Sequence, residues 1–455
     1  MADNQPIKYL DSEAEGAVLC QRCKNEKALL VSRKEPFCKN CFIRFIRGKQ
    51  RKQMQDDKYK VKYGALIEKL GVQKILLTLS GGPSSLVLLD VMASLLKEQF
   101  EGHNGKQGFE LVVLNIEEFE IQALNKRLDQ LLPQILSLYA PIKITYKVLS
   151  LSSYILDQEM LEKILINKEF TGFSSPAPKA EHRLEDLLAL CPNKSSAEDL
   201  LTIVYDELIL RTAYIESCQT ILYGHSMTRI ANEIIALTCK GRGSTIYKAV
   251  ADHSINFRDN EYKILFPLRD VLYSEVLAYS KLSGLDAYRV ESTIKKSKIT
   301  KNLTIRDLTT NYFATLDATG YASTASTVVK TGEKLGAPKD SVIAHCQICG
   351  VEIYQDPRGW LRKITVNEAA PIDTEEEKDY AKQYEATFGT EYIPDEQNPV
   401  HICYGCIVTI GGVKQDGGFV WPVKRGEYEG EIKNTYINSE DQAVLDEYIL
   451  TDDEE

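Results

Sequence analysis

Hydrophobic residues in the middle of the chain form short apolar runs that alternate with longer stretches of helical periodicity. The short runs are rich in Ile, Leu, Val and Tyr, and the segments between them are long enough for crossover helices. This alternation is typical of βα units around a parallel sheet. It predicts five strands, at 74–79, 110–116, 142–149, 220–223 and 263–266.

The segments between these runs predict helices at 84–96, 120–138, 198–217 and 271–282. The first of them places Leu86, Leu89, Val91 and Leu95 on one broad apolar face, as a helix that covers a sheet requires. Residues 167–196 contain three prolines and interrupt the rhythm, which predicts an exposed insertion. The expected fold is α/β, a Rossmann-like parallel sheet with helices on both faces.

Eight of the eleven cysteines occur in four Cys-x-x-Cys pairs. The chain has no apolar stretch of membrane-spanning length and its N-terminus has no apolar signal region, so we expect a cytosolic protein. In a reducing compartment such pairs indicate metal rather than disulfides. The spacing predicts an N-terminal zinc knuckle at Cys20, Cys23, Cys38 and Cys41, and a C-terminal zinc ribbon at Cys346, Cys349, Cys403 and Cys406.

The C-terminal cluster leaves more alternatives open than the N-terminal one. More than fifty residues separate its two pairs, so an iron–sulfur cluster or unliganded thiols compete with zinc. His345 and His401 stand beside the pairs, either as ligands or as neighbours of the ligands. The remaining thiols, Cys191, Cys218 and Cys239, have no recognisable activating motif around them, and core packing is the simple interpretation for the last two.

The net charge of −10 argues against a protein that coats nucleic acid with its whole surface. Any contact with RNA must therefore be local. Basic residues gather in the stretch 44–62 and again at 295–306, and each run is either an RNA contact or a solvated helix face. The candidates for RNA binding are Arg47, Arg51, Lys52, Lys240, Arg242, Lys295, Lys296, Lys298, Lys301 and Arg306.

The first predicted strand leads directly into Ser80-Gly81-Gly82-Pro83-Ser84-Ser85 and then into a helix. Two glycines let a backbone approach phosphate oxygens, successive amides form an anion nest, and the helix N-terminus adds its positive dipole. The segment resembles the PP-loop of ATP pyrophosphatases. In that family an aspartate usually precedes the final serine, whereas this chain has Ser84 there.

Three further segments are similar to the tRNA-thiolating branch of PP-loop proteins. They are 223–226 (Tyr-Gly-His-Ser), 241–243 (Gly-Arg-Gly) and 266–268 (Phe-Pro-Leu), the last followed by a helix with Glu275. Active members of that branch continue from Gly-His into acidic residues and carry sulfur-handling cysteines, and this chain has neither. The resemblance implies a degenerate nucleotide site, in which ATP binding is doubtful, at Ser80, Gly81, Gly82, Ser84, Ser85, Gly224 and His225.

The combination of motifs resembles the cytoplasmic tRNA 2-thiolation protein 2 family, over residues 20–422. The resemblance implies a non-catalytic subunit that forms a heterodimer with an active PP-loop thiolase. It further implies that the complex takes sulfur from a thiocarboxylated ubiquitin-related modifier and installs it on the wobble uridine of tRNAs. The chain's own share would be tRNA binding and structural support, with two structural Zn²⁺ ions and no membrane partner.

This interpretation divides the chain into five parts: a zinc module at 1–48, a basic linker helix at 49–70, a degenerate PP-loop domain at 71–340, a second zinc module at 341–425 and an acidic tail at 426–455. The tail is either a partner-docking helix or a solvated segment. Two rival functions stay open. One is an active ATP-dependent sulfurtransferase in which Cys191 or Cys239 relays sulfur, and the other is a zinc adaptor with no connection to tRNA.

Overall fold

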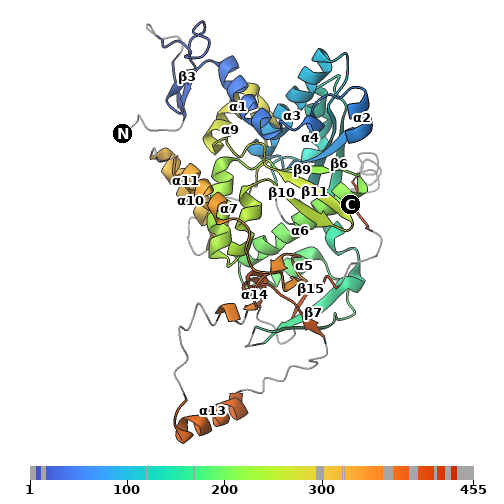
Figure 1. The fold of residues 1–455 in the computed structure, drawn as a ribbon, viewed down its shortest axis with the longest axis vertical. Helices are drawn as coiled ribbons and strands as arrows, with labels where there is room; N and C mark the ends of the chain where they lie inside the picture. Colours follow the sequence, from blue (N-terminus) through green and yellow to red (C-terminus); the bar gives the residue numbers. More distant parts are fainter. Residues whose placement is uncertain are drawn as a thin grey trace, which may run out of the picture.

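The computed structural model describes residues 7–11, 17–118, 121, 123–167, 170–293, 302–319, 321, 323–357, 359–361, 372–388, 398–413, 418–425 and 432–437. Figure 1 shows the central sheet in the middle of the molecule, a small N-terminal unit at one end and the C-terminal elements at the other. Among these residues, no helix combines the length and apolar character needed to cross a bilayer.

The central sheet has six strands in the order β10-β11-β9-β4-β5-β6. All neighbours from β11 to β6 are parallel, and only the edge strand β10 is antiparallel. The strands are β4 (Gln73–Thr78), β5 (Phe109–Glu117), β6 (Ile144–Ser150), β9 (Thr220–Leu222), β10 (His253–Phe257) and β11 (Asn260–Leu265).

Alternate residues of each central strand face opposite layers, because side chains in a strand repeat every two positions. In β4, Ile75 and Leu77 pack into one buried cluster and Leu76 packs into the other. One layer contains α3 (Pro83–Gly102), α4 (Leu128–Ser137) and α9 (Tyr273–Ser283). The opposite layer contains α6 (Lys194–Ile215) and α7 (Met227–Cys239), so helices cover both faces as predicted.

The five strands predicted from the sequence are confirmed, but two features of this domain were missed. The antiparallel strand β10 was not predicted, although His253–Phe257 alternates between half-buried and exposed positions along its length. The helix predicted at 120–138 begins only at Leu128. The segment before it instead pairs with residues 291–293, through backbone hydrogen bonds that involve Asn125 and Ala123.

A second sheet joins the predicted insertion to the module that carries the C-terminal cysteines. Its order is β14-β8-β7-β15, and all three pairings are antiparallel. The strands are β7 (Leu161–Ile166), β8 (Gly172–Pro176), β14 (Pro399–Val400) and β15 (Phe419–Pro422). The prediction of an exposed insertion was therefore wrong, because β8 pairs on both edges and α5 (Leu184–Ala189) buries Leu184 and Leu187.

The N-terminal unit contains a three-stranded sheet and one long helix. Its elements are β1 (Ile7–Tyr9), β2 (Leu30–Ser32), β3 (Glu35–Phe37) and α1 (Lys39–Gln53). The basic linker helix predicted at 49–70 is not a single helix. α1 begins within the N-terminal cysteine module, directly after Cys38, and the rest of the stretch contains only a short 3₁₀ turn and α2 (Ala65–Leu70).

The other elements surround these three sheets. The helices are α8 (Ile246–Val250), α10 (Ile305–Ala318), α11 (Ser323–Leu335), α13 (Glu375–Phe388) and α14 (Tyr404–Ile410), and the strands are β12 (Ala344–His345) and β13 (Glu352–Ile353). Near the C-terminus, the backbone of residues 435–437 pairs with the free edge of β6. This pairing covers an edge that would otherwise present unpaired donors and acceptors.

Glu275 on α9 holds the N-terminal unit against the central domain. Its fully buried carboxylate accepts hydrogen bonds from Ser32 Oγ at 2.9 Å and from Arg33 Nε at 2.7 Å. Lys49 Nζ lies 3.4 Å from the other oxygen, which also accepts from the Leu272 amide at 2.9 Å. Burial alone would raise the pKa of Glu275, but Arg33 and Lys49 lower it below its usual value.

Replacing Glu275 with Ala should therefore detach the N-terminal unit and lower the free energy of unfolding by about 2–4 kcal/mol, below the full cost of a broken buried pair because Arg33 stays 40% exposed. Because the folded pKa is depressed, this contribution is present at neutral pH and is lost as the pH falls through the acidic range. Denaturant unfolding at pH 7 and pH 4 checks this. An equal loss in Glu261→Ala, at an exposed glutamate, would contradict it.

Candidate functional site

The segment that resembles a PP-loop, residues 80–85, is called the phosphate loop below. It connects the end of β4 to the start of α3. Gly81 adopts φ +76°, a conformation that favours glycine. The loop is closed by a contact of 3.3 Å between Ser80 Oγ and Ser85 Oγ, and Ser85 Oγ donates to the Gly82 carbonyl at 3.0 Å. Pro83 stands at the first position of α3, where it has no N–H to offer a phosphate. The strand–loop–helix arrangement is present with one amide fewer.

Val290 covers this loop from the side. The Val290 amide donates to the Gly81 carbonyl at 3.0 Å, and a Cβ on Gly81 would lie 2.7 Å from Val290 Cγ2. The covering segment is held by the Asn125 amide, which donates to the Glu291 carbonyl at 2.9 Å. The Thr293 amide donates likewise to the Ala123 carbonyl at 2.8 Å. Gly81 is thus needed for packing against Val290, independently of any phosphate.

Gly224 and His225 follow β9 and lie beside the phosphate loop. A Cβ on Gly224 would approach the backbone of Ser84 and Ser85 to 3.1 Å, a tight contact, so the close approach of the two loops favours glycine. The His225 ring stacks on Phe266 with centroids 5.4 Å apart and planes 17° apart. Burial, followed by the positive charge of Arg229, lowers the pKa of His225 to about 3. The imidazole is therefore neutral at physiological pH.

The phosphate loop, Gly224 and His225 line one large cleft of about 1990 Å³. The cleft also contains Arg229 and Glu233 on α7 and Arg306 on α10. Arg306 Nε donates to Glu233 Oε2 at 3.0 Å. Burial would raise the pKa of Glu233, but Arg306 and Arg229 lower it to about 2. Arg229 thus follows the Gly-His segment where the resemblance implies acidic residues, and its partner Glu233 is already paired.

No described residue of the cleft supplies a free reactive thiol. Cys349 is the one cysteine that lines it, and this residue belongs to the C-terminal cluster. Cys191 and Cys218 do not line the cleft, and burial raises their pKa values to about 11 and about 12. Cys239 is exposed at the end of α7. The thiols proposed for an active sulfurtransferase are therefore not brought to the phosphate loop.

Each predicted cysteine quartet is assembled. Within each set, the four sulfur atoms lie within 4.8 Å of one another. The Cys23 and Cys38 sulfurs are 3.9 Å apart, and those of Cys349 and Cys403 are 3.7 Å apart. A tetrahedral ion with metal–sulfur bonds of about 2.3 Å separates its ligands by roughly 3.8 Å. Both quartets therefore fit a single metal ion, and all eight thiols are free of disulfides.

Arg242 lies against the C-terminal quartet. It is 7% exposed, and its nitrogens lie 3.8 Å from the sulfurs of Cys349 and Cys403 and 3.5 Å from that of Cys406. Its Nε donates to Asp199 Oδ2 on α6 at 2.7 Å. Burial alone would lower the pKa of Arg242, but Cys406 and Asp199 raise it well above its usual value. The buried guanidinium, already paired with Asp199, is also placed to offset the negative charge of thiolates, as a metal-bound quartet would carry.

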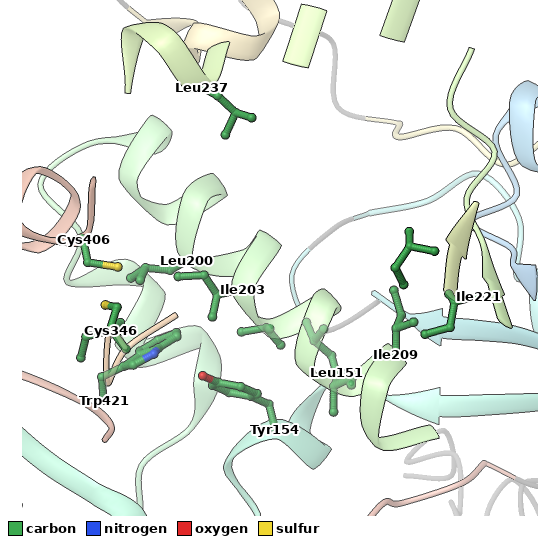
Figure 2. Close-up of a cluster of buried hydrophobic side chains, with 14 of the residues drawn as sticks. Leu151, Tyr154, Leu200, Ile203, Ile209, Ile221, Leu237, Cys346, Cys406 and Trp421 are labelled. Carbon is green, nitrogen blue, oxygen red and sulfur yellow. The ribbon is translucent and has the colours of Figure 1, made fainter. Parts of the chain in front are cut away.

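The quartet is also continuous with the hydrophobic core. Figure 2 shows Cys346 beside Trp421 and Cys406 beside Leu200, at one end of a row of buried side chains. The row continues toward the central sheet through Tyr154, Leu151, Ile209 and Ile221. The C-terminal metal site is therefore built into the core of the molecule rather than attached to it.

Several predicted RNA contacts are placed elsewhere. Lys240, Arg242 and Arg306 were wrong as candidates, because they are only 5–7% exposed and form ion pairs with Asp199 or Glu233. Lys295, Lys296, Lys298 and Lys301 lie outside the described residues.

The three candidates on α1 differ among themselves. Arg47 pairs with Asp90 at 3.5 Å and Arg51 pairs with Glu98, while Lys52 is exposed. Sequence reasoning also missed the role of Arg242 beside the thiolates and the pair formed by Arg306 and Glu233. The Gly-Arg-Gly signal had marked Arg242, but as a residue for RNA.

The chain is similar over nearly its whole length to curated proteins that share one name. A family model for cytoplasmic tRNA 2-thiolation protein 2 matches residues 304–408. The curated protein of that name from Scheffersomyces stipitis is 62% identical, with 100% of both chains covered. Its counterpart in Debaryomyces hansenii is 63% identical over 99% of each chain. The one from Saccharomyces cerevisiae is 32% identical over 96% of this chain and 99% of its own.

Among solved structures, a U34-tRNA thiolase from Methanococcus maripaludis with its [4Fe-4S] cluster aligns with a TM-score of 0.48. That alignment has 15% sequence identity and covers 78% of this chain and 98% of the thiolase.

Replacing Arg242 with Ala should weaken metal binding at the C-terminal quartet by about 10–100-fold, because the thiolates lose their neighbouring positive charge. The measurement is the rate at which a chelator removes metal from the C-terminal quartet. Arg242→Lys should be intermediate, since it keeps the charge but not the planar fork. Arg229→Ala, in the cleft, is the matched control, and equal metal loss in it would count against the assignment.

Replacing His225 with Phe should make stability less sensitive to acid. The unfolded histidine takes up a proton near pH 6.5 and the folded one only near pH 3, so wild-type stability falls as the pH drops between them. Between pH 6.5 and 5 the difference amounts to about 1–2 kcal/mol. Denaturant midpoints of His225→Phe and of the exposed-site control His103→Phe measure it, and parallel pH profiles would refute the prediction.

Proposed function

Because the chain belongs to the cytoplasmic tRNA 2-thiolation protein 2 family, we propose that it is the non-catalytic subunit of a tRNA-thiolating complex. The family acts in cytoplasmic tRNA 2-thiolation, and the cytosolic location predicted from the sequence agrees with the names of its relatives. The further proposal is a heterodimer with a catalytic PP-loop thiolase. That complex uses sulfur from a thiocarboxylated ubiquitin-related modifier to modify the wobble uridine.

The observation that carries this proposal is a loop that has the shape of a PP-loop but lacks residues on which PP-loop chemistry depends. Thiolation needs an activated uridine oxygen and a sulfur nucleophile. The loop has Ser84 where the PP-loop has an acid, and Pro83 removes an amide donor. Arg229 occupies the cleft wall where a metal-binding acid would serve, and the described cleft residues include no thiol outside the metal quartet.

The missing groups also define what the partner must supply. A second chain would hold ATP and its metal ion, activate the uridine and carry the sulfur, because the described cleft residues of this chain offer no acid at position 84 and no thiol outside the cysteine quartet. The rival function, an independent sulfurtransferase, needs Cys191 or Cys239 near the loop, and neither lines the cleft. The contribution left to this chain is to bind tRNA and to stabilise the catalytic subunit.

We assign zinc to both quartets. Sulfur separations of 3.7–3.9 Å suit one tetrahedral ion, whereas an iron–sulfur cluster inserts several iron atoms between its thiolates and needs a wider cage. Four protein ligands leave no open coordination position, so both sites are structural. The N-terminal ion organises the unit carried by residues 1–48. The C-terminal ion at 341–425 organises the module whose helix α14 packs on α6.

The isolated chain should therefore show no tRNA-dependent exchange between ATP and pyrophosphate above background. Thiolated tRNA should form only when the catalytic subunit is present, and removing this chain should reduce its yield. Ser84→Asp alone should not create exchange, because Pro83 and Arg229 remain. Exchange or thiolation by the isolated wild-type chain would overturn the proposal. Incorporation of labelled pyrophosphate into ATP measures the exchange, and mass spectrometry of tRNA nucleosides measures the thiolation.

A further inference from the structure

The N-terminal unit carries a concentration of positive charge that contrasts with the rest of the protein. Residues 7–53, which make up this unit, contain twelve basic and five acidic side chains. The remaining chain then has 43 basic and 60 acidic residues out of totals of 55 and 65. A Zn²⁺ ion with four thiolates would remove only two of the unit's positive charges. A local cationic surface on an acidic protein is the arrangement expected of a site for nucleic-acid phosphates.

About half of these cations are engaged in folding. Arg33 and Lys49 bind Glu275, and Arg47 pairs with Asp90, which fixes the unit on the central domain. Arg22 and Arg51 pair with neighbouring glutamates. Within the described part of the chain, six are exposed without an ion pair: Lys24, Lys27, Lys34, Lys39, Arg44 and Lys52. Arg44 and Lys52 lie on one face of α1, with Gly48 open between them.

Two of the six occupy positions where a lysine is conformationally unfavourable. Lys24 follows the first Cys-x-x-Cys pair with φ +58°, and Lys34 lies at the tip of the β2–β3 hairpin with φ +71°. Side chains with a Cβ rarely adopt such angles, and glycine does so readily. The equivalent position after Cys346-x-x-Cys349 is Gly350, at φ +75°. In both turns the amide makes the same hydrogen bond. Lys24 N donates to the Cys20 carbonyl at 2.8 Å, and Gly350 N donates to the Cys346 carbonyl at 2.7 Å.

The chain therefore builds the same turn twice and uses glycine only once. Folding alone favours glycine at position 24, and at position 34 a two-residue hairpin turn favours glycine or asparagine. Strain that is retained with an exposed charge points to a function for that charge. We infer that Lys24 and Lys34, together with the Arg44–Lys52 face of α1, form a binding site for the phosphate backbone of RNA.

This inference rests on the proposed function, which makes tRNA the RNA in question. Glu275 keeps the unit in one orientation, so the cationic surface is presented rigidly at one end of the molecule (Figure 1). Of the three tRNA contacts predicted on α1, only Lys52 belongs to this site. Arg47 instead holds the unit in place through Asp90 and Tyr279, and Arg51 pairs with Glu98.

The double variant Lys24→Gly/Lys34→Gly separates a binding role from a structural one, because the two roles predict opposite changes. The metal-loaded complex should bind a tRNA transcript roughly tenfold more weakly, with the slope of log affinity against log salt reduced by about 1.4–1.8. The thermal midpoint of the chain should rise, because two strained positions are relieved. Fluorescence anisotropy across a salt series and thermal unfolding measure the two effects.

Two controls accompany this variant. Asn104→Gly relieves another exposed position with positive φ, at +53°, and should raise stability without changing tRNA affinity. Lys330→Ala/Lys334→Ala removes two exposed positive charges from α11 and should leave affinity and salt slope nearly unchanged.

The outcomes distinguish the inference from the function beneath it. Unaltered tRNA affinity in Lys24→Gly/Lys34→Gly, or an equal loss in the α11 control, would overturn this site while the proposed function stands. Weakened association with the catalytic subunit at unchanged tRNA affinity would also overturn it, in favour of an acidic protein surface as the partner. A wild-type complex that fails to bind tRNA would refute the proposed function itself.

Discussion

The position of the cleft follows from one constraint, the reversal of strand order at β4. This strand pairs in parallel with β5 on one side and with β9 on the other. The loops that follow β4 and β9 therefore leave the sheet at the same edge and diverge to opposite faces, which opens a crevice between them. The phosphate loop, Gly224 and His225 meet there because of this topology. The same divergence sends α3 and α7 into different layers, and the C-terminal elements reach the crevice by packing on α6.

Two buried ion clusters attach the small units to this sheet, and they use the same physics. Glu275 pairs with Arg33 and Lys49 of the N-terminal unit. Arg242 pairs with Asp199 on α6 and contacts the cysteine sulfurs of the C-terminal unit. A buried charge is costly unless its partners are in place, so each cluster admits one arrangement of the segments that supply it. Such clusters specify how units are joined more than they stabilise them.

Most of the framework could be predicted because it depends on local pattern. Apolar runs gave the parallel strands, cysteine spacing gave both quartets, and the Gly-Gly turn gave the phosphate loop. What could not be predicted depends on partners far away in the chain. β8 pairs with β14 and β7 pairs with β15, each across more than two hundred residues, and a short strand without its neighbours resembles a loop in the sequence. The charges of Lys240, Arg242 and Arg306 were visible, but only burial against Asp199 and Glu233 shows that they point inward.

The phosphate loop illustrates how packing can preserve a motif independently of its chemistry. Gly81 is required because Val290 lies against it, and glycine is favoured at position 224 because the backbone of Ser84 and Ser85 lies close to it. Neither requirement involves a phosphate. A side chain at either glycine would disturb the packing between β4, α3 and the segment after α9, so the fold itself preserves the Gly-Gly signature. Position 84 has no such packing role in these contacts, and an acid there would matter only to a bound metal. The Gly-Gly motif therefore indicates the architecture of the crevice, and the residues that follow its glycines indicate whether the loop can act on a nucleotide.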